Sequence, residues 1–341
     1  MKKALKIAGW TVGGILAAPI LLGAALKLNA REVPPPGEMI DVGGYSLHIH
    51  CTGEDTGLPT AVIETGSGEA SPLFHWIQAG LEGTTRVCAY DRPGIGWSEE
   101  SGLPRDSKHI NEALHTLLDK AGVEKPFVFV GHSIAGLYNR DYIERYPGDV
   151  SGLVLLDPSH PRQGEAMGID NAKFLPGLEA QLKPLRLLIA TGYVELFNPL
   201  EQGVEHTPVA EYPQEIQDQL TYLGKRGETY TAFLAEFRDF ELAAKQADAN
   251  KTLDDMPFTI ISAGEPQSGE GWPEEINPER ITRILKDLHT EMEALSTNSK
   301  RATIPGADHM SLITDRKYAE ATLPHIRDVI LQAAARSQNN D

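Results

Sequence analysis

One short segment of the chain changes from a strand pattern to a helix pattern and carries a serine at the junction. Phe127 to Val130 are consecutive apolar residues, which is typical of a strand buried in a parallel sheet. Leu137 to Arg145 has the pattern of a helix that ends at Tyr146-Pro147-Gly148. Ser133 lies between them, where so short a connection strains the backbone and exposes the hydroxyl above the sheet. The segment therefore predicts a parallel α/β sheet with a serine at the carboxyl end of one strand.

Other strand patterns alternate with helix patterns along the chain. A helix is expected from Ser107 to Ala121, with Gly122 as its stop, and another from Tyr318 to Ala335. This alternation predicts the α/β fold class, with a mainly parallel eight-stranded sheet flanked by helices. Besides the strand at 127–130, the predicted strands are 39–42, 45–51, 60–64, 85–90, 152–156, 257–263 and 301–304.

Residues 161–254 separate two of these strands without containing a strand pattern of their own. About ninety residues are too many for a plain connection, and helix-like pieces occur at 185–196 and 230–247. We expect a helical cap over the carboxyl edge of the sheet, where open α/β sheets bind ligands. The core domain would then comprise residues 38–160 and 255–341.

Residues 7–26 are an uncharged stretch with lysines on both sides. A helix of this length spans about 30 Å, the thickness of a bilayer core. We therefore expect a transmembrane anchor or signal segment over residues 1–30, followed by a stiff proline-rich linker at 31–37. The preceding lysines favour a folded domain outside the cytoplasm, on the periplasmic or extracellular side. A cleaved signal peptide, with secretion, is the alternative.

Charge and cysteine content exclude some classes of function. The formal net charge of −17 argues against a nucleic-acid partner. No CxxC or HExxH motif occurs, so we expect neither a metal site nor a cofactor. Cys51 and Cys88 both fall in strand patterns, where buried free thiols are the favoured interpretation. An exported location would also permit a disulfide between them.

Further motifs follow in a familiar order: Asp91-Arg-Pro-Gly-Ile-Gly-Trp-Ser98, then Gly131-His-Ser-Ile-Ala135, then Gly306-Ala-Asp-His309. From residue 38 to 335 the chain resembles the α/β-hydrolase superfamily, in its serine-nucleophile branch, which is esterase- or lipase-like with a cap after the sixth strand. Two of the motif regions depart from the superfamily pattern, besides the position of the triad acid. Ala135 replaces the last glycine of Gly-x-Ser-x-Gly, and Thr65-Gly66-Ser67 replaces the usual His-Gly after the third strand.

The resemblance implies a catalytic triad. Ser133 would be the nucleophile and His309, behind the last strand, its base. The acid is less determined, because Gln267 stands where the superfamily usually has aspartate. Asp157, after the sixth strand, occupies the other known position and is favoured, with Glu265 as the alternative. The backbone amides of Ile134 and Ser67 would form the oxyanion hole.

The implied reaction is hydrolysis of a carboxylic ester through an acyl-enzyme on Ser133. Amidase or iminopeptidase, lactonase and haloperoxidase activities share the same triad, and a ligand sensor with little turnover is a different class. Epoxide hydrolases and haloalkane dehalogenases use an aspartate nucleophile, so the serine argues against them. A small-molecule acyl substrate with a hydrophobic group is expected, because the cap offers apolar side chains for a roof: Leu185, Leu187, Leu188, Ile189, Tyr193, Leu196 and Phe197.

Overall fold

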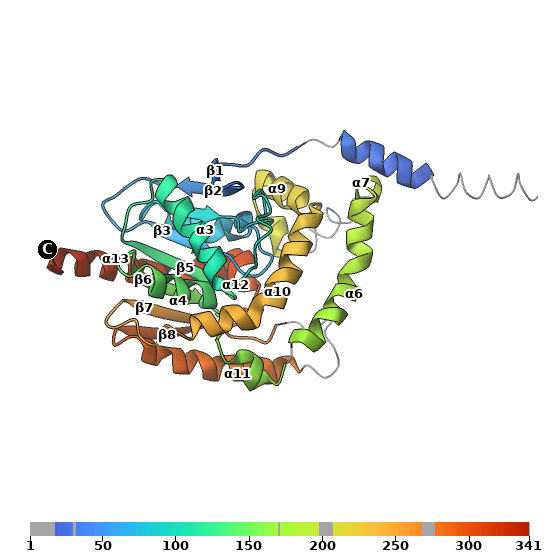
Figure 1. Cartoon of the computed structure of the whole chain (residues 1–341). Coiled ribbons are helices and arrows are strands. Elements are labelled where there is room, and N and C mark those ends of the chain that lie inside the picture. The colour runs from blue at the N-terminus through green and yellow to red at the C-terminus, as the bar shows by residue number, and fades with distance from the viewer. Residues whose placement is uncertain (1–17, 30–31, 170, 198–206, 268–276, 341) are drawn as a thin grey trace, which may run out of the picture.

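An eight-stranded sheet runs through the centre of the molecule in the order β1-β2-β4-β3-β5-β6-β7-β8 (Figure 1). The computed structural model describes residues 18–29, 32–169, 171–197, 207–267 and 277–340. β2 pairs antiparallel with β1 and β4, and all other neighbours are parallel, which confirms the predicted mainly parallel sheet. The strands are β1 (Glu38–Asp41), β2 (Ser46–Thr52), β3 (Ala61–Glu64), β4 (Val87–Tyr90), β5 (Phe127–His132), β6 (Val150–Leu156), β7 (Phe258–Ala263) and β8 (Ser299–Ile304).

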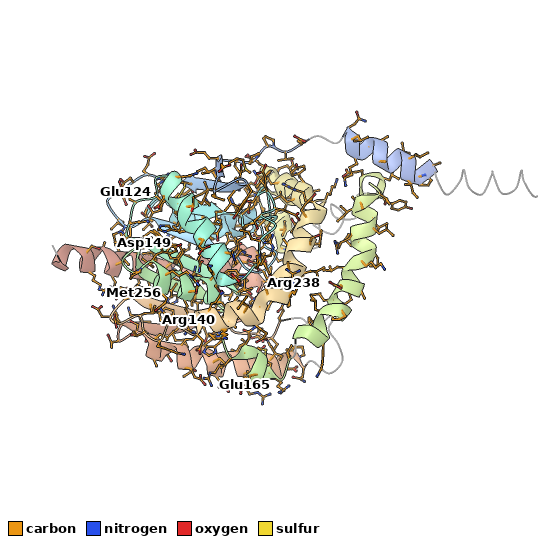
Figure 2. The ribbon with its side chains drawn as sticks, viewed as in Figure 1. Glu124, Arg140, Asp149, Glu165, Arg238 and Met256 are labelled. Atoms are coloured by element: carbon orange, nitrogen blue, oxygen red, sulfur yellow. A yellow bond between two sulfur atoms is a disulfide. The ribbon has the colours of Figure 1, made fainter. Side chains whose placement is uncertain are left out.

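Helices cover both faces of the sheet, and alternate residues of each buried strand contact opposite layers. In β5, Val128 and Val130 join the apolar cluster that includes α2 (His75–Leu81), α12 (Ser311–Thr314) and α13 (Arg316–Asn340). Phe127 and Phe129 join the cluster that includes α3 (Ser107–Lys120) and α4 (Ala135–Arg145). Side chains fill the space on both faces (Figure 2). Each fully buried side chain of this kind contributes roughly 1.5–3 kcal/mol, so the central strands are rigid supports for the loops at their ends.

The chain between β6 and β7 is helical, and its described residues contain no strand. We call residues 161–254 the cap. Its long helix α10 packs against α3 and α4 on one side and α6 on the other (Figure 1). The predicted helix at 185–196 is confirmed in part: residues 185–190 belong to α6 and residues 194–196 to α7, and Gly192, with a φ of 71°, lies in the break between them. The cap elements are α5 (Gln163–Met167), α6 (Asn171–Ala190), α7 (Val194–Phe197), η2 (Pro208–Glu211), α9 (Gln214–Gly224) and α10 (Gly227–Ala247).

Cys51 and Cys88 are joined by a disulfide, so the favoured prediction of buried free thiols is wrong. The two residues stand directly opposite each other in the antiparallel pair of β2 and β4. Side chains at opposed positions of such a pair lie within reach of each other. This register depends on how the strands align, which the two isolated sequence patterns do not specify.

The predicted membrane segment at 7–26 lies largely outside the described residues, which begin at 18. Residues 18–28 are helical and contact the cap, where Lys27 Nζ donates a hydrogen bond to the Ile189 carbonyl (3.2 Å). Gly23 lies against Gly192 so closely that a Cβ at Gly23 would be 2.8 Å from the Gly192 oxygen. Within the part of the chain that the structure describes, no helix has the length and apolar character needed to cross a bilayer.

Candidate active site

Ser133 sits in a sharp turn between β5 and α4, as the sequence pattern predicted. Its φ is 56°, a left-handed backbone conformation that residues other than glycine rarely adopt, and its amide donates to the Leu156 carbonyl (3.1 Å). The close approach of strand and helix requires glycine on either side. A Cβ at Gly131 would be 2.2 Å from Asn139 Oδ1, and one at Gly136 would be 2.5 Å from the Ser159 carbonyl. The turn therefore presents the serine at the carboxyl end of a central strand.

His309 and Asp157 meet at the same edge of the sheet, on loops that follow β8 and β6. His309 Nδ1 donates to Asp157 Oδ2 (2.7 Å), and the Ala263 amide donates to Asp157 Oδ1 (3.0 Å). Burial disfavours the Asp157 carboxylate, but the hydrogen bond and charge of His309 outweigh burial and hold the pKa of Asp157 well below its usual range. The alternative acid, Glu265, is exposed, and no hydrogen bond or ion pair joins it to His309 among the described residues. The structure thus pairs His309 with Asp157.

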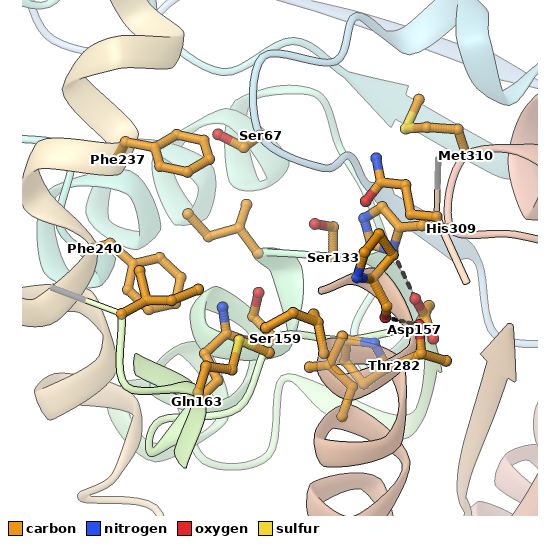
Figure 3. Close-up of a pocket in the computed structure, with 18 of the residues that line it drawn as sticks. Ser67, Ser133, Asp157, Ser159, Gln163, Phe237, Phe240, Thr282, His309 and Met310 are labelled. Atoms are coloured by element: carbon orange, nitrogen blue, oxygen red, sulfur yellow. Dashed lines mark hydrogen bonds and ion pairs between the residues drawn. The ribbon is translucent and has the colours of Figure 1, made fainter. Parts of the chain in front are cut away.

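The imidazole of His309 is suited to accept a proton. Burial would lower the pKa of His309, but the hydrogen bond and negative charge of Asp157 outweigh burial and raise the pKa above its ordinary 6.5. With Nδ1 held by Asp157, Nε2 is the nitrogen left for Ser133. Figure 3 shows Ser133, His309 and Asp157 gathered at one side of a pocket. No hydrogen bond links Ser133 Oγ to His309 among the described residues, and such contacts commonly tighten only when substrate binds.

The two predicted oxyanion amides also border this pocket. Ile134 directly follows Ser133 and forms the N-cap of α4, where helix amides lack intrahelical acceptors. Ser67 lies on the loop after β3. Neither amide has a hydrogen-bond acceptor within the described ranges, so both are available to a ligand. Two free donors that border the same pocket as the serine are what stabilisation of a tetrahedral oxyanion requires.

The pocket lies between the carboxyl ends of the strands and the cap, with a volume of about 490 Å³. Phe237 and Phe240 of α10 stand across it from His309 (Figure 3). The predicted roof at 185–197 is wrong, because none of its described side chains lines the pocket and Leu187 is exposed. His160, which follows β6, is not among the lining residues either. The apolar lining comes from Met167, Ile169, Phe174, Leu178, Phe233, Phe237, Phe240, Ile281, Leu285 and Met310.

Residues 48–321 match the alpha/beta hydrolase family. The chain belongs to this family. It is 25% identical over 269 residues to an uncharacterized protein of Schizosaccharomyces pombe, covering 70% of this chain and 48% of that protein. The chain spans about half the length of the curated relatives it matches.

Solved structures share the fold of this α/β hydrolase. Cfl2 from Burkholderia cenocepacia superimposes with a TM-score of 0.60 at 20% identity, covering 85% of this chain and 94% of that one. The Cif epoxide hydrolase from Acinetobacter nosocomialis gives a TM-score of 0.62 at 14% identity, covering 91% and 95%. At these identities the likeness concerns the fold alone, so the chemistry must be argued from the site.

Two further histidines, His289 and His132, support the α/β-hydrolase site. His289 is buried, with Nε2 2.9 Å from the Pro158 carbonyl and Nδ1 2.8 Å from Ser262 Oγ. Burial lowers the pKa of His289, so a neutral ring that donates from Nε2 and accepts at Nδ1 satisfies both contacts. His132 holds the carbonyl of His309 through Nε2 (3.0 Å). These contacts steady the backbone beside Asp157 and His309.

A buried carboxylate, Glu69, also borders the pocket and was missed by the sequence analysis. Its Oε2 lies 3.0 Å from His132 Nδ1 and accepts from the Gly66 amide (2.6 Å). Burial disfavours ionisation, but the charge and hydrogen bond of His132 outweigh burial and lower the pKa of Glu69. A fixed negative charge therefore stands beside His309, and its field adds to the rise in the His309 pKa.

A second missed group is a buried ion network formed by Arg92, Glu64 and Glu236. Arg92 follows β4, Glu64 ends β3, and Glu236 belongs to the cap helix α10; all three are fully buried. The sequence analysis gave none of these three residues a role in the site. The available signal was spacing, because Glu236 is three residues after Phe233 and four before Phe240, and therefore lies on the helix face that meets the core.

Proposed function

We propose that this α/β hydrolase is a serine-dependent carboxylic ester hydrolase. The observation that carries the proposal is the His309–Asp157 pair at the edge of the pocket that also exposes Ser133 in its strained turn. In this arrangement His309 is the base, Asp157 orients it, and Ser133 is the nucleophile. Glu265 is the alternative acid only if His309 turns away from Asp157.

The reaction has two halves. Ser133 Oγ attacks the acyl carbonyl while its proton moves to His309 Nε2, and the oxyanion accepts hydrogen bonds from the amides of Ile134 and Ser67. His309 then protonates the leaving alcohol, which departs and leaves an acyl-enzyme. Water, deprotonated by His309, attacks the ester of Ser133. The bond between the acyl carbon and Oγ then breaks, the carboxylic acid leaves, and His309 returns the proton to Ser133 Oγ. Asp157 stabilises the imidazolium form of His309 in both halves.

The pocket favours neutral, hydrophobic substrates. Phenylalanine rings of the cap, among them Phe233 and Phe237 with centroids 4.9 Å apart, offer apolar contact area. Glu69 and Glu265 are the charged carboxylates of the lining besides Asp157, so an anionic acyl chain would be repelled. An ester with an uncharged hydrocarbon or aromatic group is therefore the proposed substrate class.

Covalent labelling tests this function directly. Wild-type enzyme should react with a fluorophosphonate probe, and peptide mass spectrometry should place the adduct on Ser133. S133A should be folded, unlabelled and inactive on chromogenic esters. Labelling of a different serine, or turnover by S133A, would contradict the proposal. A folded wild-type protein without labelling would favour the ligand-sensor alternative.

We also propose that residues 7–26 attach the enzyme to a membrane, with the folded domain outside the cytoplasm. Exposed apolar side chains lie on two helices that touch each other, the helix at 18–28 and α6. They are Leu21, Leu22 and Leu28 on the first and Leu187 on the second. Cell fractionation followed by carbonate extraction should retain the full chain in membranes and release a variant that starts at residue 31. Recovery of a shortened chain in the external medium would support the cleaved-signal alternative.

A further inference from the structure

The loop at 65–68, which carries the proposed oxyanion amide of Ser67, is hydrogen-bonded to one carboxylate of the cap, that of Glu236. Glu236 Oε2 accepts from Ser67 Oγ (2.8 Å) and from the Gly68 amide (2.9 Å). Its other oxygen, Oε1, accepts from Arg92 Nε (2.8 Å). One oxygen of Glu236 thus binds Ser67 and Gly68 of the loop, and the other oxygen binds Arg92 of the core.

Arg92 of the core forms hydrogen bonds to the remaining residues of the same loop. Its Nη1 donates to the Thr65 carbonyl (2.6 Å) and to Glu64 Oε1 (2.8 Å), and its Nη2 donates to the Gly66 carbonyl. Burial opposes its charge, but the carboxylates of Glu236 and Glu64 outweigh burial and raise the pKa of Arg92, so the guanidinium stays charged. Every residue of the loop from 65 to 68 is therefore bonded to this network, while the Ser67 amide itself is left free.

Contact between α10 and the loop is too close for any residue except glycine at position 68. Gly68 adopts a φ of 69°, and a Cβ there would be 2.7 Å from the ring of Phe233. Phe233 and Glu236 are neighbours on one face of α10. The helix thus touches the loop through both an apolar ring and a charged hydrogen-bond acceptor.

We propose that Glu236 is a positioning residue that holds the oxyanion loop in its reactive geometry, so that docking of the cap and assembly of the oxyanion hole are a single event. The proposal rests on the ester hydrolase function proposed above. Oxyanion stabilisation depends on donors that are oriented before the reaction, in a site that excludes water. A buried carboxylate that accepts hydrogen bonds from three residues is rigid in this way. Displacement of α10 would release Ser67 and Gly68 and abolish catalysis without any change at Ser133 or His309.

The test compares E236Q with D239N, a matched variant on the same helix. Asp239 also ties α10 to the core, because its Oδ2 accepts from the Arg105 amide (2.8 Å), but among the described residues no hydrogen bond or ion pair joins it to residues 65–68. In E236Q an amide nitrogen replaces one carboxylate oxygen and cannot accept a hydrogen bond. The variant therefore loses the hydrogen bonds either from Ser67 and Gly68 or from Arg92. We expect kcat of E236Q to fall by about 10²-fold with little change in KM. D239N should keep the wild-type kcat.

A transition-state readout separates positioning from a structural role. A trifluoromethyl ketone forms a tetrahedral adduct with Ser133 and uses the oxyanion hole, whereas the matching methyl ketone binds without needing it. In E236Q the inhibition constant of the trifluoromethyl ketone should rise by the same factor as kcat falls. The inhibition constant of the methyl ketone should not change. Equal losses for both ketones, or a raised KM with normal kcat, would overturn the proposal.

A second variant decides the matter if E236Q does not fold. S67A keeps the Ser67 amide and removes only the hydroxyl that donates to Glu236. S67A should lower kcat and raise the inhibition constant of the trifluoromethyl ketone in parallel, both by less than E236Q does. An unchanged kcat and an unchanged inhibition constant would overturn the proposal. Fluorophosphonate labelling of the wild type keeps the two hypotheses distinct. An unlabelled wild type would refute the ester hydrolase function, whereas a labelled, active wild type with unaffected variants refutes only the role of Glu236.

Discussion

Replacing Ser133 by glycine and by alanine separates the chemistry of this residue from the strain of its backbone. Both variants lack the hydroxyl and should be inactive. They differ in the conformation that they tolerate, because Ser133 has a φ of 56°, which glycine adopts freely and alanine does not. Any difference in stability between the two variants therefore measures strain stored in the turn.

The magnitude follows from two opposing terms. Strain at a non-glycine residue in this region costs about 1–3 kcal/mol, and glycine loses about 0.5–1 kcal/mol more conformational entropy on folding than alanine. S133G should thus have a free energy of unfolding about 1 kcal/mol higher than that of S133A. S133A should stay within about 1 kcal/mol of the wild type, because Ser133 Oγ makes no hydrogen bond among the described residues.

Urea unfolding followed by circular dichroism measures these differences. A135G is the matched control, since Ala135 is the first residue of α4 in the same turn and has a helical conformation. Glycine should destabilise that position by about 0.5–1 kcal/mol, opposite in sign to the effect at position 133. If S133G is no more stable than S133A, or if A135G also stabilises, the turn stores no strain at the serine and the reasoning fails.

The remaining predictions concern the triad and the disulfide. D157N should lower kcat on an ester by about 10⁴-fold while E265Q leaves it unchanged; the reverse result would give the acid role to Glu265. kcat/KM should rise with pH as His309 loses its proton, with a midpoint above 6.5 because its pKa is raised, and a wild-type midpoint below 6.5 would contradict the pairing with Asp157. The double variant C51A/C88A opens a link between residues 37 apart and should lose about 4 kcal/mol of unfolding free energy in urea. Equal stability would mean that the purified protein holds free thiols.

Local patterns in the sequence were sufficient for much of the fold. All eight strands lie close to where they were predicted. Among them β5, β6 and β7 are buried parallel strands, and such strands are short apolar runs with little ambiguity. The turn at Ser133 was predictable for the same reason, since strand, small residues and helix follow one another within a few positions. Where the pattern depended on a single residue it was less reliable, as the break at Gly192 shows.

The sequence by itself determined the sheet, the strained serine turn and the order of Ser133, Asp157 and His309 along the chain, because these depend on interactions between neighbouring residues. Only the tertiary structure decided which carboxylate faces His309, that Cys51 pairs with Cys88, and that Glu236 is buried against the oxyanion loop. Each of these brings together residues far apart in sequence. Such contacts are set by strand register and by the packing of the cap on the core, where a charged residue is stable only if its partners arrive from other elements.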